Sequence, residues 1–279
     1  MAAEAKPAKE RSGLSLAVGD ALATAFFVFV SSTFEEVAEI IGPALGMPAL
    51  AAGLSVLVGG LIVFGPVADW LGGPGALFNP SHNLAFAALG QGKKRTHLMR
   101  MVFQIVGGVL GAVAALVFIP VSWQRNFYKM ALGPRPGVSL RVAVLVEGLL
   151  TYLLNLVILY ATSAENKYLA YWSPLVATVA LVTTGAELTG PSMNPAFTFG
   201  WFAQFGTIAA REHFLVFWLG PLLGGLLAGL TWRVFVVTKP NQRPGNAVLV
   251  DKPAASDDLQ QTPEPKKAKR KLLLARVQV

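Results

Sequence analysis

The chain contains no cysteine and little charge, and both absences limit what it can be. Without cysteine it can form no disulfide, use no thiolate and bind no metal through sulfur, and its redox compartment cannot be inferred. Only 14% of the 279 residues are charged, whereas 54% are hydrophobic and the mean hydropathy is +0.55. This balance indicates that most of the chain lies in a lipid bilayer.

The sequence also lacks the patterns of enzymes and of metal or cofactor proteins. It shows no set of nucleophile, base and orienting residue, and no phosphate-binding glycine loop after a strand. Its histidines, His82, His97 and His213, are dispersed, and we place the last two near water or headgroups at helix ends. We therefore expect no enzymatic activity, no metal and no cofactor.

Positive charge is concentrated at the chain ends. The formal net charge is +8, but nine of the 23 Lys and Arg residues follow Thr238. We expect this basic tail to contact anionic lipid headgroups, with no nucleic acid as a partner. The N-terminus has no apolar stretch followed by a small-residue cleavage site, so no cleaved signal peptide is expected.

Six apolar stretches are long enough to cross the bilayer as helices, which takes roughly 20 residues. They cover about residues 14–34, 47–68, 98–119, 138–161, 168–188 and 213–237. Glu35, Glu36 and Glu39 follow the first stretch, where we expect a solvated loop. With both termini in the cytosol, the inner segments before the tail carry eight Lys and Arg residues and the outer segments five, which favours this orientation.

Two further apolar pieces, residues 79–90 and 194–206, are too short to span and each opens with Asn-Pro. Asn can cap free amides, and Pro at the first helical position has no N–H to lose. Both pieces are predicted to be re-entrant half-helices covered by protein or by a water-filled cavity.

The two halves of the chain repeat the same features. The matched pairs are Asp20 with Glu147, Thr24 with Thr151, Asn79-Pro80 with Asn194-Pro195, and Gly107 and Gly111 with Gly220 and Gly224. The paired glycines are expected to let helices approach closely. Each copy holds three spans and one half-helix, so the second copy must cross the membrane in the opposite sense.

Half-helices that enter from opposite faces would meet with their N-termini near the middle of the bilayer. Each N-terminus acts as about half a positive charge and presents free N–H groups. Asn79 and Asn194 would each direct an amide N–H at a passing oxygen. A water held by two such donors turns its lone pairs toward the centre, which breaks a proton wire, so the pattern favours small neutral molecules.

These features resemble the aquaporin, or major intrinsic protein, family over roughly residues 14–238. The stretches "FNPSH", "FIPVSW" and "TGPSMNPAFTFGW" and the Lys-rich tail are most similar to the plant small basic intrinsic proteins, first subgroup. The resemblance implies an all-α membrane protein with six transmembrane helices plus two re-entrant half-helices in two inverted repeats. It further implies a passive channel for water and other small neutral solutes, a homotetramer, and residence in the endoplasmic reticulum membrane, with the plasma membrane as the alternative.

The expected domain order follows from this resemblance. A cytosolic segment covers residues 1–13, a channel domain 14–238, and a basic, disordered cytosolic tail 239–279. Repeat one covers about 14–121 and repeat two about 138–238.

The resemblance also assigns roles to pore residues. Asn79 and Asn194 match the family's paired pore asparagines, and Pro80 and Pro195 match the prolines that hold the half-helices tip to tip. Ser81 stands where most members carry Ala and adds a hydroxyl near the midpoint.

The expected outer selectivity filter is apolar. Most members carry an Arg after the second motif, and this chain carries Phe197. By family spacing, Val182 and Pro191 occupy two further filter positions, and the fourth lies near Gly59. If the Phe197 ring faces the pore it hinders water; if it turns into the bundle the pore is wider.

Three intramembrane ionisable residues have alternative roles. His82 stands three residues after Asn79, on the cytosolic side of the pore, and could gate it through a charge change near its ordinary pKa of about 6.5. Alternatively, it is hydrogen-bonded to a neighbouring loop. Asp20 and Glu147 are expected to accept hydrogen bonds from the re-entrant loops.

Two other functions remain open. Asp20 or Glu147 could carry protons in a proton-coupled secondary transporter. Phe197 and the long tail also fit a poorly conducting membrane protein with a structural role.

Overall fold

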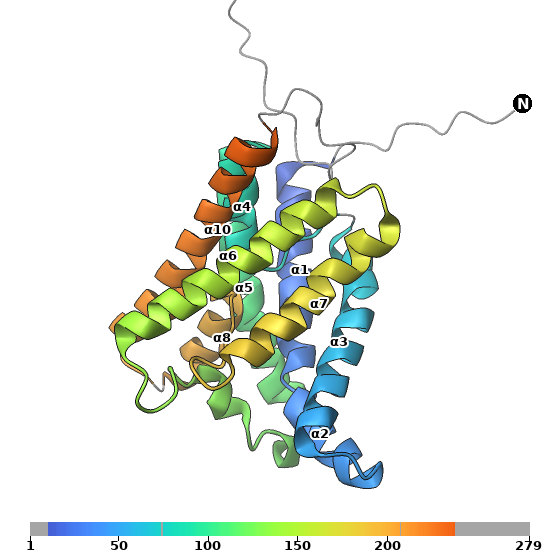
Figure 1. Cartoon of the computed structure of the whole chain (residues 1–279). Helices are drawn as coiled ribbons and strands as arrows, with labels where there is room; N and C mark the ends of the chain where they lie inside the picture. The colour runs from blue at the N-terminus through green and yellow to red at the C-terminus, as the bar shows by residue number, and fades with distance from the viewer. Residues whose placement is uncertain (1–10, 74, 207, 238–279) are drawn as a thin grey trace, which may run out of the picture.

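The computed structural model describes residues 11–73, 75–206 and 208–237, and this part of the chain is helical without strands (Figure 1). Most of the predicted N-terminal segment and the whole predicted tail at 239–279 lie outside the described residues. The long helices are α1 (Gly13–Ser31), α3 (Ala49–Gly72), α5 (Lys94–Phe118), α6 (Leu140–Ser163), α7 (Lys167–Gly185) and α10 (Gly220–Trp232). The half-helices are α4 (Pro80–Leu89) and α8 (Pro195–Phe205).

Shorter helices connect these elements. Helix α2 (Phe34–Ala44) follows α1, and two short 3-10 turns, η1 (Val121–Trp123) and η2 (Phe127–Ala131), link α5 to α6. Helix α10 is preceded by α9 (Ala210–Phe214) and the π-helical η3 (Leu215–Leu219), and is followed by the π-helical η4 (Arg233–Val237).

Five stretches of the described residues are long and apolar enough to cross a membrane. They are Gly13–Ala44, Ala49–Gly72, Lys94–Phe118, Leu140–Ser163 and Ala210–Val236. The remaining predicted span forms α7, which packs against α6 and α3. Helix α7 is less apolar than these five stretches and is not counted with them. The first half of α7 carries Tyr168, Tyr171, Trp172, Ser173 and Pro174, which lower its hydropathy.

The inverted repeat predicted from the sequence is present in the packing. Helix α1 packs along α5 in the first half, as α6 packs along α10 in the second. The half-helices are exchanged between the halves, because α5 holds α8 and α10 holds α4. Neither repeat therefore encloses its own half-helix.

Glycines allow these close approaches. Gly107 and Gly111 of α5 lie against the backbone carbonyl groups of Ala21 and Ala25, where a Cβ atom would collide. Between them, Gly108 faces the backbone of α8 in the same way. The corresponding glycines of α10 lie against α6 and α4. The predicted role of the paired glycines in helix packing therefore fits the structure.

A buried ion pair anchors the first re-entrant segment. Asp20 accepts hydrogen bonds at 2.8 Å from the Leu77 backbone N–H and at 2.7 Å from the Gln104 amide. The Arg100 guanidinium binds the same carboxylate through Nε and Nη2, each at 2.8 Å, and Nη2 also donates to Gly75 O. Both charged side chains are essentially inaccessible to solvent. The carboxylate thus joins α1, α5 and the loop that leads to α4.

Glu147 anchors the second re-entrant segment in a simpler way. Its carboxylate accepts hydrogen bonds from the backbone N–H groups of Ser192 and Met193, at 3.2 and 2.9 Å. Among the described residues Glu147 has no ion-pair partner. The two acids therefore occupy equivalent places but differ in how their charge is compensated.

The region after α1 corrects one prediction. Glu35, Glu36 and Glu39 lie on α2, and Glu36 is buried. Arg125 binds Glu36 and Glu39 at 2.6 Å each, so its cation compensates the buried carboxylate. Lys129 lies 2.7 Å from Glu35, and the hydrogen bond to this carboxylate raises the pKa of the lysine amine. Helix α2 is thus tied to the α5–α6 connection.

We expect Arg100→Met to destabilise the protein by about 3 kcal/mol or more, because it leaves the Asp20 carboxylate buried without its cation. Thermal unfolding of the purified protein in detergent, followed by intrinsic fluorescence, measures the effect. The double variant Asp20→Asn, Arg100→Met should recover much of the loss. Equal unfolding temperatures for the parent and the single variant would contradict the anchoring role of the pair.

Candidate pore

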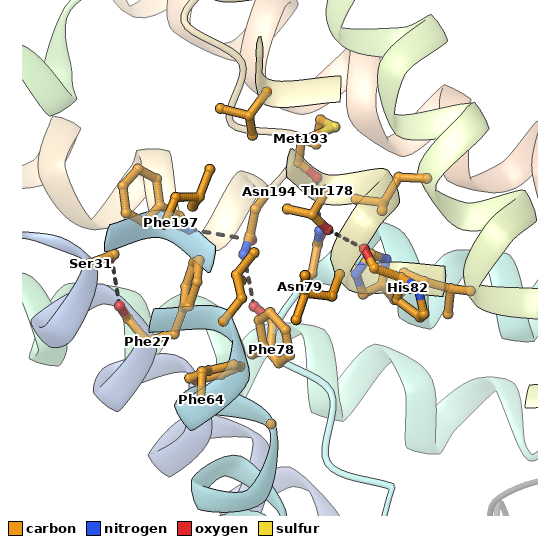
Figure 2. A pocket seen from close by; sticks show the side chains of 18 of the residues that line it. Phe27, Ser31, Phe64, Phe78, Asn79, His82, Thr178, Met193, Asn194 and Phe197 are labelled. Carbon is orange, nitrogen blue, oxygen red and sulfur yellow. Dashed lines mark hydrogen bonds between the residues drawn. The ribbon is translucent and has the colours of Figure 1, made fainter. Parts of the chain in front are cut away.

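A cavity of about 450 Å³ adjoins the tips of α4 and α8 (Figure 2). Its wall comes from α1, α2, α3, α6, α7 and both re-entrant segments, and it is mostly apolar. Polar side chains on the wall include Asn79, Asn194, His82, Ser31 and Thr178. The Ser31 and Thr178 hydroxyls donate to carbonyl groups of their own helices.

The asparagines of the two Asn-Pro motifs are held by reciprocal hydrogen bonds. Asn79 Nδ2 donates to Met193 O at 2.8 Å, and Asn194 Nδ2 donates to Phe78 O at 3.0 Å. Each amide therefore binds the residue that precedes the other asparagine. The second hydrogen of each Nδ2 remains for the cavity, which both residues line.

Each asparagine is also the N-cap of its half-helix. Asn79 Oδ1 accepts from the Ser81 backbone N–H, and Asn194 Oδ1 accepts from the N–H groups of Ala196 and Phe197. These bonds establish which end of each amide is oxygen. Pro80 and Pro195 are the first residues of α4 and α8, and both are buried. The two half-helices contact each other.

The Ser81 side chain forms a hydrogen bond that has no counterpart in the second half, where Ala196 occupies the matching described position. Its Oγ donates to Asn79 Oδ1 at 2.9 Å and lies 3.4 Å from Asn155 Nδ2. Asn155 Nδ2 also donates to Thr151 O at 2.8 Å. The Ser81 hydroxyl therefore links Asn79 to α6.

Met193 has an unusual backbone conformation, with φ at 53°. A positive φ is uncommon for a residue other than glycine. This conformation directs the Met193 N–H to Glu147 and its carbonyl oxygen to Asn79. The buried acid and the opposite asparagine together hold the strained residue in place.

A group of phenyl rings forms the wall beside the asparagines. Phe64 lies 4.5 Å from Phe78 and 5.1 Å from Phe27 between ring centroids, and Phe27 lies 5.8 Å from Phe197. Only Phe197 of this group was singled out from the sequence. Phe78 immediately precedes Asn79 and could have been found from that position.

The structure locates the predicted filter residues. Val182 and Pro191 line the cavity together with Phe197, whose ring contacts Phe27 at the wall and does not turn away from the cavity (Figure 2). Phe197 and Ser192 also border a second cavity of about 460 Å³, which polar and apolar residues line together and which includes the charged side chains of Glu35, Lys129 and Arg135. The Phe197 ring thus lies between a mostly apolar cavity and one that contains charged side chains.

The fourth predicted filter position, near Gly59, is not occupied by Gly59 itself. Gly59 does not line the cavity, and it is exposed with open space where a side chain would lie. Leu57 and Leu61, two residues to either side, line the cavity instead. Residues two apart on a helix point in different directions, so a small error in spacing changes the face.

His82 lies on the cavity wall but is only 5% exposed. Its Nδ1 is 2.9 Å from Asn155 Oδ1, so its partner belongs to α6 and not to a neighbouring loop. Asn155 was missed from the sequence, although a polar residue within an apolar span signals a functional position.

The other histidines are buried, contrary to the prediction of water or headgroup positions. His97 Nδ1 lies 2.9 Å from Asn83 Oδ1, and its Nε2 lies 2.8 Å from Gln91 O. The His213 ring stacks on Phe202 with 4.0 Å between centroids. Within the described ranges, no group of three His, Asp or Glu residues could hold a metal ion.

Comparisons with known proteins agree with this geometry. The family model described as "Major intrinsic protein" matches residues 8–232. Aquaporin SIP1-1 of Oryza sativa subsp. japonica is 34% identical over 194 residues, which cover 68% of this chain and 76% of that protein. Aquaporin SIP1-2 of Zea mays is 32% identical over 235 residues, which cover 81% and 94%.

A solved structure supports the fold. The X-ray structure of the aquaglyceroporin from Plasmodium falciparum matches with a TM-score of 0.59 and 18% identity, covering 81% of this chain and 98% of that chain. The similarity to the SIP aquaporins confirms the predicted resemblance to the small basic intrinsic proteins. The protein is an integral membrane protein with the aquaporin fold, and the chain belongs to the major intrinsic protein family.

Proposed function

We propose that this protein is a passive channel for water and other small neutral solutes. The observation that carries the proposal is the pair of asparagine amides, each with one hydrogen bound to the opposite loop and one left for the cavity. Membership of a channel family and the aquaporin fold support the same reading and give no support to an enzyme.

The proposed exclusion of protons follows from these donors. The N-termini of α4 and α8 lie at the same place as the amides and add two partial positive charges. A water that accepts from both asparagines cannot also pass a proton along a continuous chain, and cations are repelled. Asn79, Asn194, Pro80, Pro195 and Ser81 are the proposed pore residues.

The proton-coupled transporter is less well supported. Asp20 is compensated by Arg100, and Glu147 accepts two backbone hydrogen bonds. Neither carboxylate lines the cavity. Both are therefore proposed to support the re-entrant loops. A poorly conducting structural protein remains the second alternative because of the aromatic wall.

Stopped-flow swelling of proteoliposomes tests the proposal. A channel gives a flux that is linear in the gradient with a low activation energy, whereas a carrier saturates. Flux no greater than that of empty liposomes would favour the structural alternative, and a coupled proton current would favour the transporter.

We also propose a homotetramer in the endoplasmic reticulum membrane, with the termini in the cytosol. The family resemblance supports the tetramer and the location, and the excess of Lys and Arg in the inner segments supports the orientation. Light scattering of the detergent-solubilised protein tests the oligomer, and a monomeric mass would refute it. Microscopy of a fluorescent fusion tests the location, with the plasma membrane as the alternative.

The apolar filter is proposed to limit the rate of water flux. Phe197→Arg should raise water permeability severalfold, because a cationic side chain supplies the hydrogen-bond donors that a phenyl ring lacks. Phe205→Arg is the matched control, since Phe205 lies on the same helix and is exposed away from the cavity. Stopped-flow water permeability that is unchanged in Phe197→Arg would remove the filter as the limiting element.

Charge gating by His82 stays a prediction. If it operates, water permeability of the parent falls between about pH 8 and 5.5, because an imidazolium adds positive charge beside two helix N-termini. His82→Ala should abolish that dependence. The same pH profile in parent and variant liposomes would exclude His82 as the gate.

A further inference from the structure

The hydrogen bonds of Asn155 determine which nitrogen of the His82 ring carries a hydrogen. Asn155 Nδ2 donates to Thr151 O at 2.8 Å and lies 3.4 Å from Ser81 Oγ, so the amide nitrogen is committed to these oxygens. The amide oxygen, Oδ1, must then be the atom that lies 2.9 Å from His82 Nδ1. Because a carbonyl oxygen only accepts, Nδ1 carries the hydrogen.

The other ring nitrogen is left as an acceptor. A neutral imidazole with a hydrogen on Nδ1 has a lone pair on Nε2. Among the described residues Nε2 has no hydrogen-bond partner, and His82 lines the cavity. Figure 2 shows the ring on the cavity wall, on the same side as Asn79.

We infer that His82 is a hydrogen-bond acceptor of the pore, held in that state by Asn155 as a positioning residue. This inference rests on the proposed channel function and specifies its solutes. The asparagine amides donate to a solute oxygen, and His82 Nε2 accepts a hydrogen from the same molecule or from the one next to it.

Acceptors are scarce elsewhere on this wall. The carbonyl oxygens of Phe78 and Met193 each accept from an asparagine, and each asparagine Oδ1 accepts from its own half-helix, so these oxygens have less capacity left than an unbound ring nitrogen. Four hydroxyl groups on this wall each donate to a backbone carbonyl oxygen and are weaker acceptors than an imidazole nitrogen; they belong to Ser31, Tyr171, Thr178 and Ser192. A solute with O–H groups would lose hydrogen bonds along the phenyl wall without His82.

The favoured solutes are therefore small, neutral and hydroxylated. Water, hydrogen peroxide and short diols carry both the oxygen that the amides require and the O–H that Nε2 requires. The chemical class of the solutes follows from the asparagine donors and the His82 acceptor, which share an otherwise apolar wall.

The chain contains a matched control for this arrangement. His97 is also buried, and its Nδ1 also lies 2.9 Å from an asparagine oxygen, that of Asn83. His97 does not line the cavity, and its Nε2 is bound to Gln91 O. The same substitution can therefore be made at a histidine that solutes do not reach.

Flux measurements test the acceptor. In proteoliposomes, His82→Leu should lower the permeability to water and to ethylene glycol roughly fivefold, the factor of one neutral hydrogen bond, while His82→Gln retains most of it. His97→Leu should leave both permeabilities per reconstituted channel unchanged. Equal or faster flux through His82→Leu would overturn the inference.

Nitrogen NMR tests the tautomer without any transport. With ¹⁵N-labelled histidine in the full-length parent protein, the Nε2 signal that disappears in His82→Leu should be that of an unprotonated ring nitrogen. Asn155→Leu should yield a mixture of tautomers and an intermediate flux. A protonated Nε2 in a conducting parent overturns the acceptor alone, whereas a parent without flux overturns the proposed function and the solute role together.

Discussion

Two amide hydrogen bonds, from Asn79 to Met193 O and from Asn194 to Phe78 O, join the tips of the half-helices. Two other sets of residues in the centre of the bundle support these bonds. The glycines of α5 and α10 bring the half-helices close enough to meet, and the buried acids hold the loops that present the two carbonyl groups. Losing this contact would separate the donors that define the proposed pore.

The sequence predicted the fold well because its main signals are local or repeated. Asn-Pro predicts a helix start from chemistry within four residues, and spans follow from apolar length. The repetition of an acid at Asp20 and Glu147 predicted that each would support one re-entrant loop. In the structure each carboxylate accepts a hydrogen bond from the backbone of such a loop. The α7 span was predicted together with the other five, but its aromatic and polar residues make it less apolar than the five stretches found in the structure.

The lining of the cavity was harder to predict because it depends on the direction of single side chains. Family spacing placed the fourth filter position near Gly59, but Gly59 is exposed, and residues two positions to either side line the cavity. The partner of His82 lies 73 residues away on α6, and no local pattern connects them. Likewise, the burial of Glu36 depends on Arg125, which lies in a distant connection.

The contact between His82 and Asn155 joins the first repeat to the second, and it has no symmetric copy. The position that corresponds to Asn155 in the first repeat is occupied by Val28, which is buried in an apolar cluster. Similarly, His213 stands where symmetry would place a second Arg100, and it stacks on Phe202. The two repeats therefore match in their backbone packing but differ in these side chains, and two copies of either half would lack the contact between His82 and Asn155.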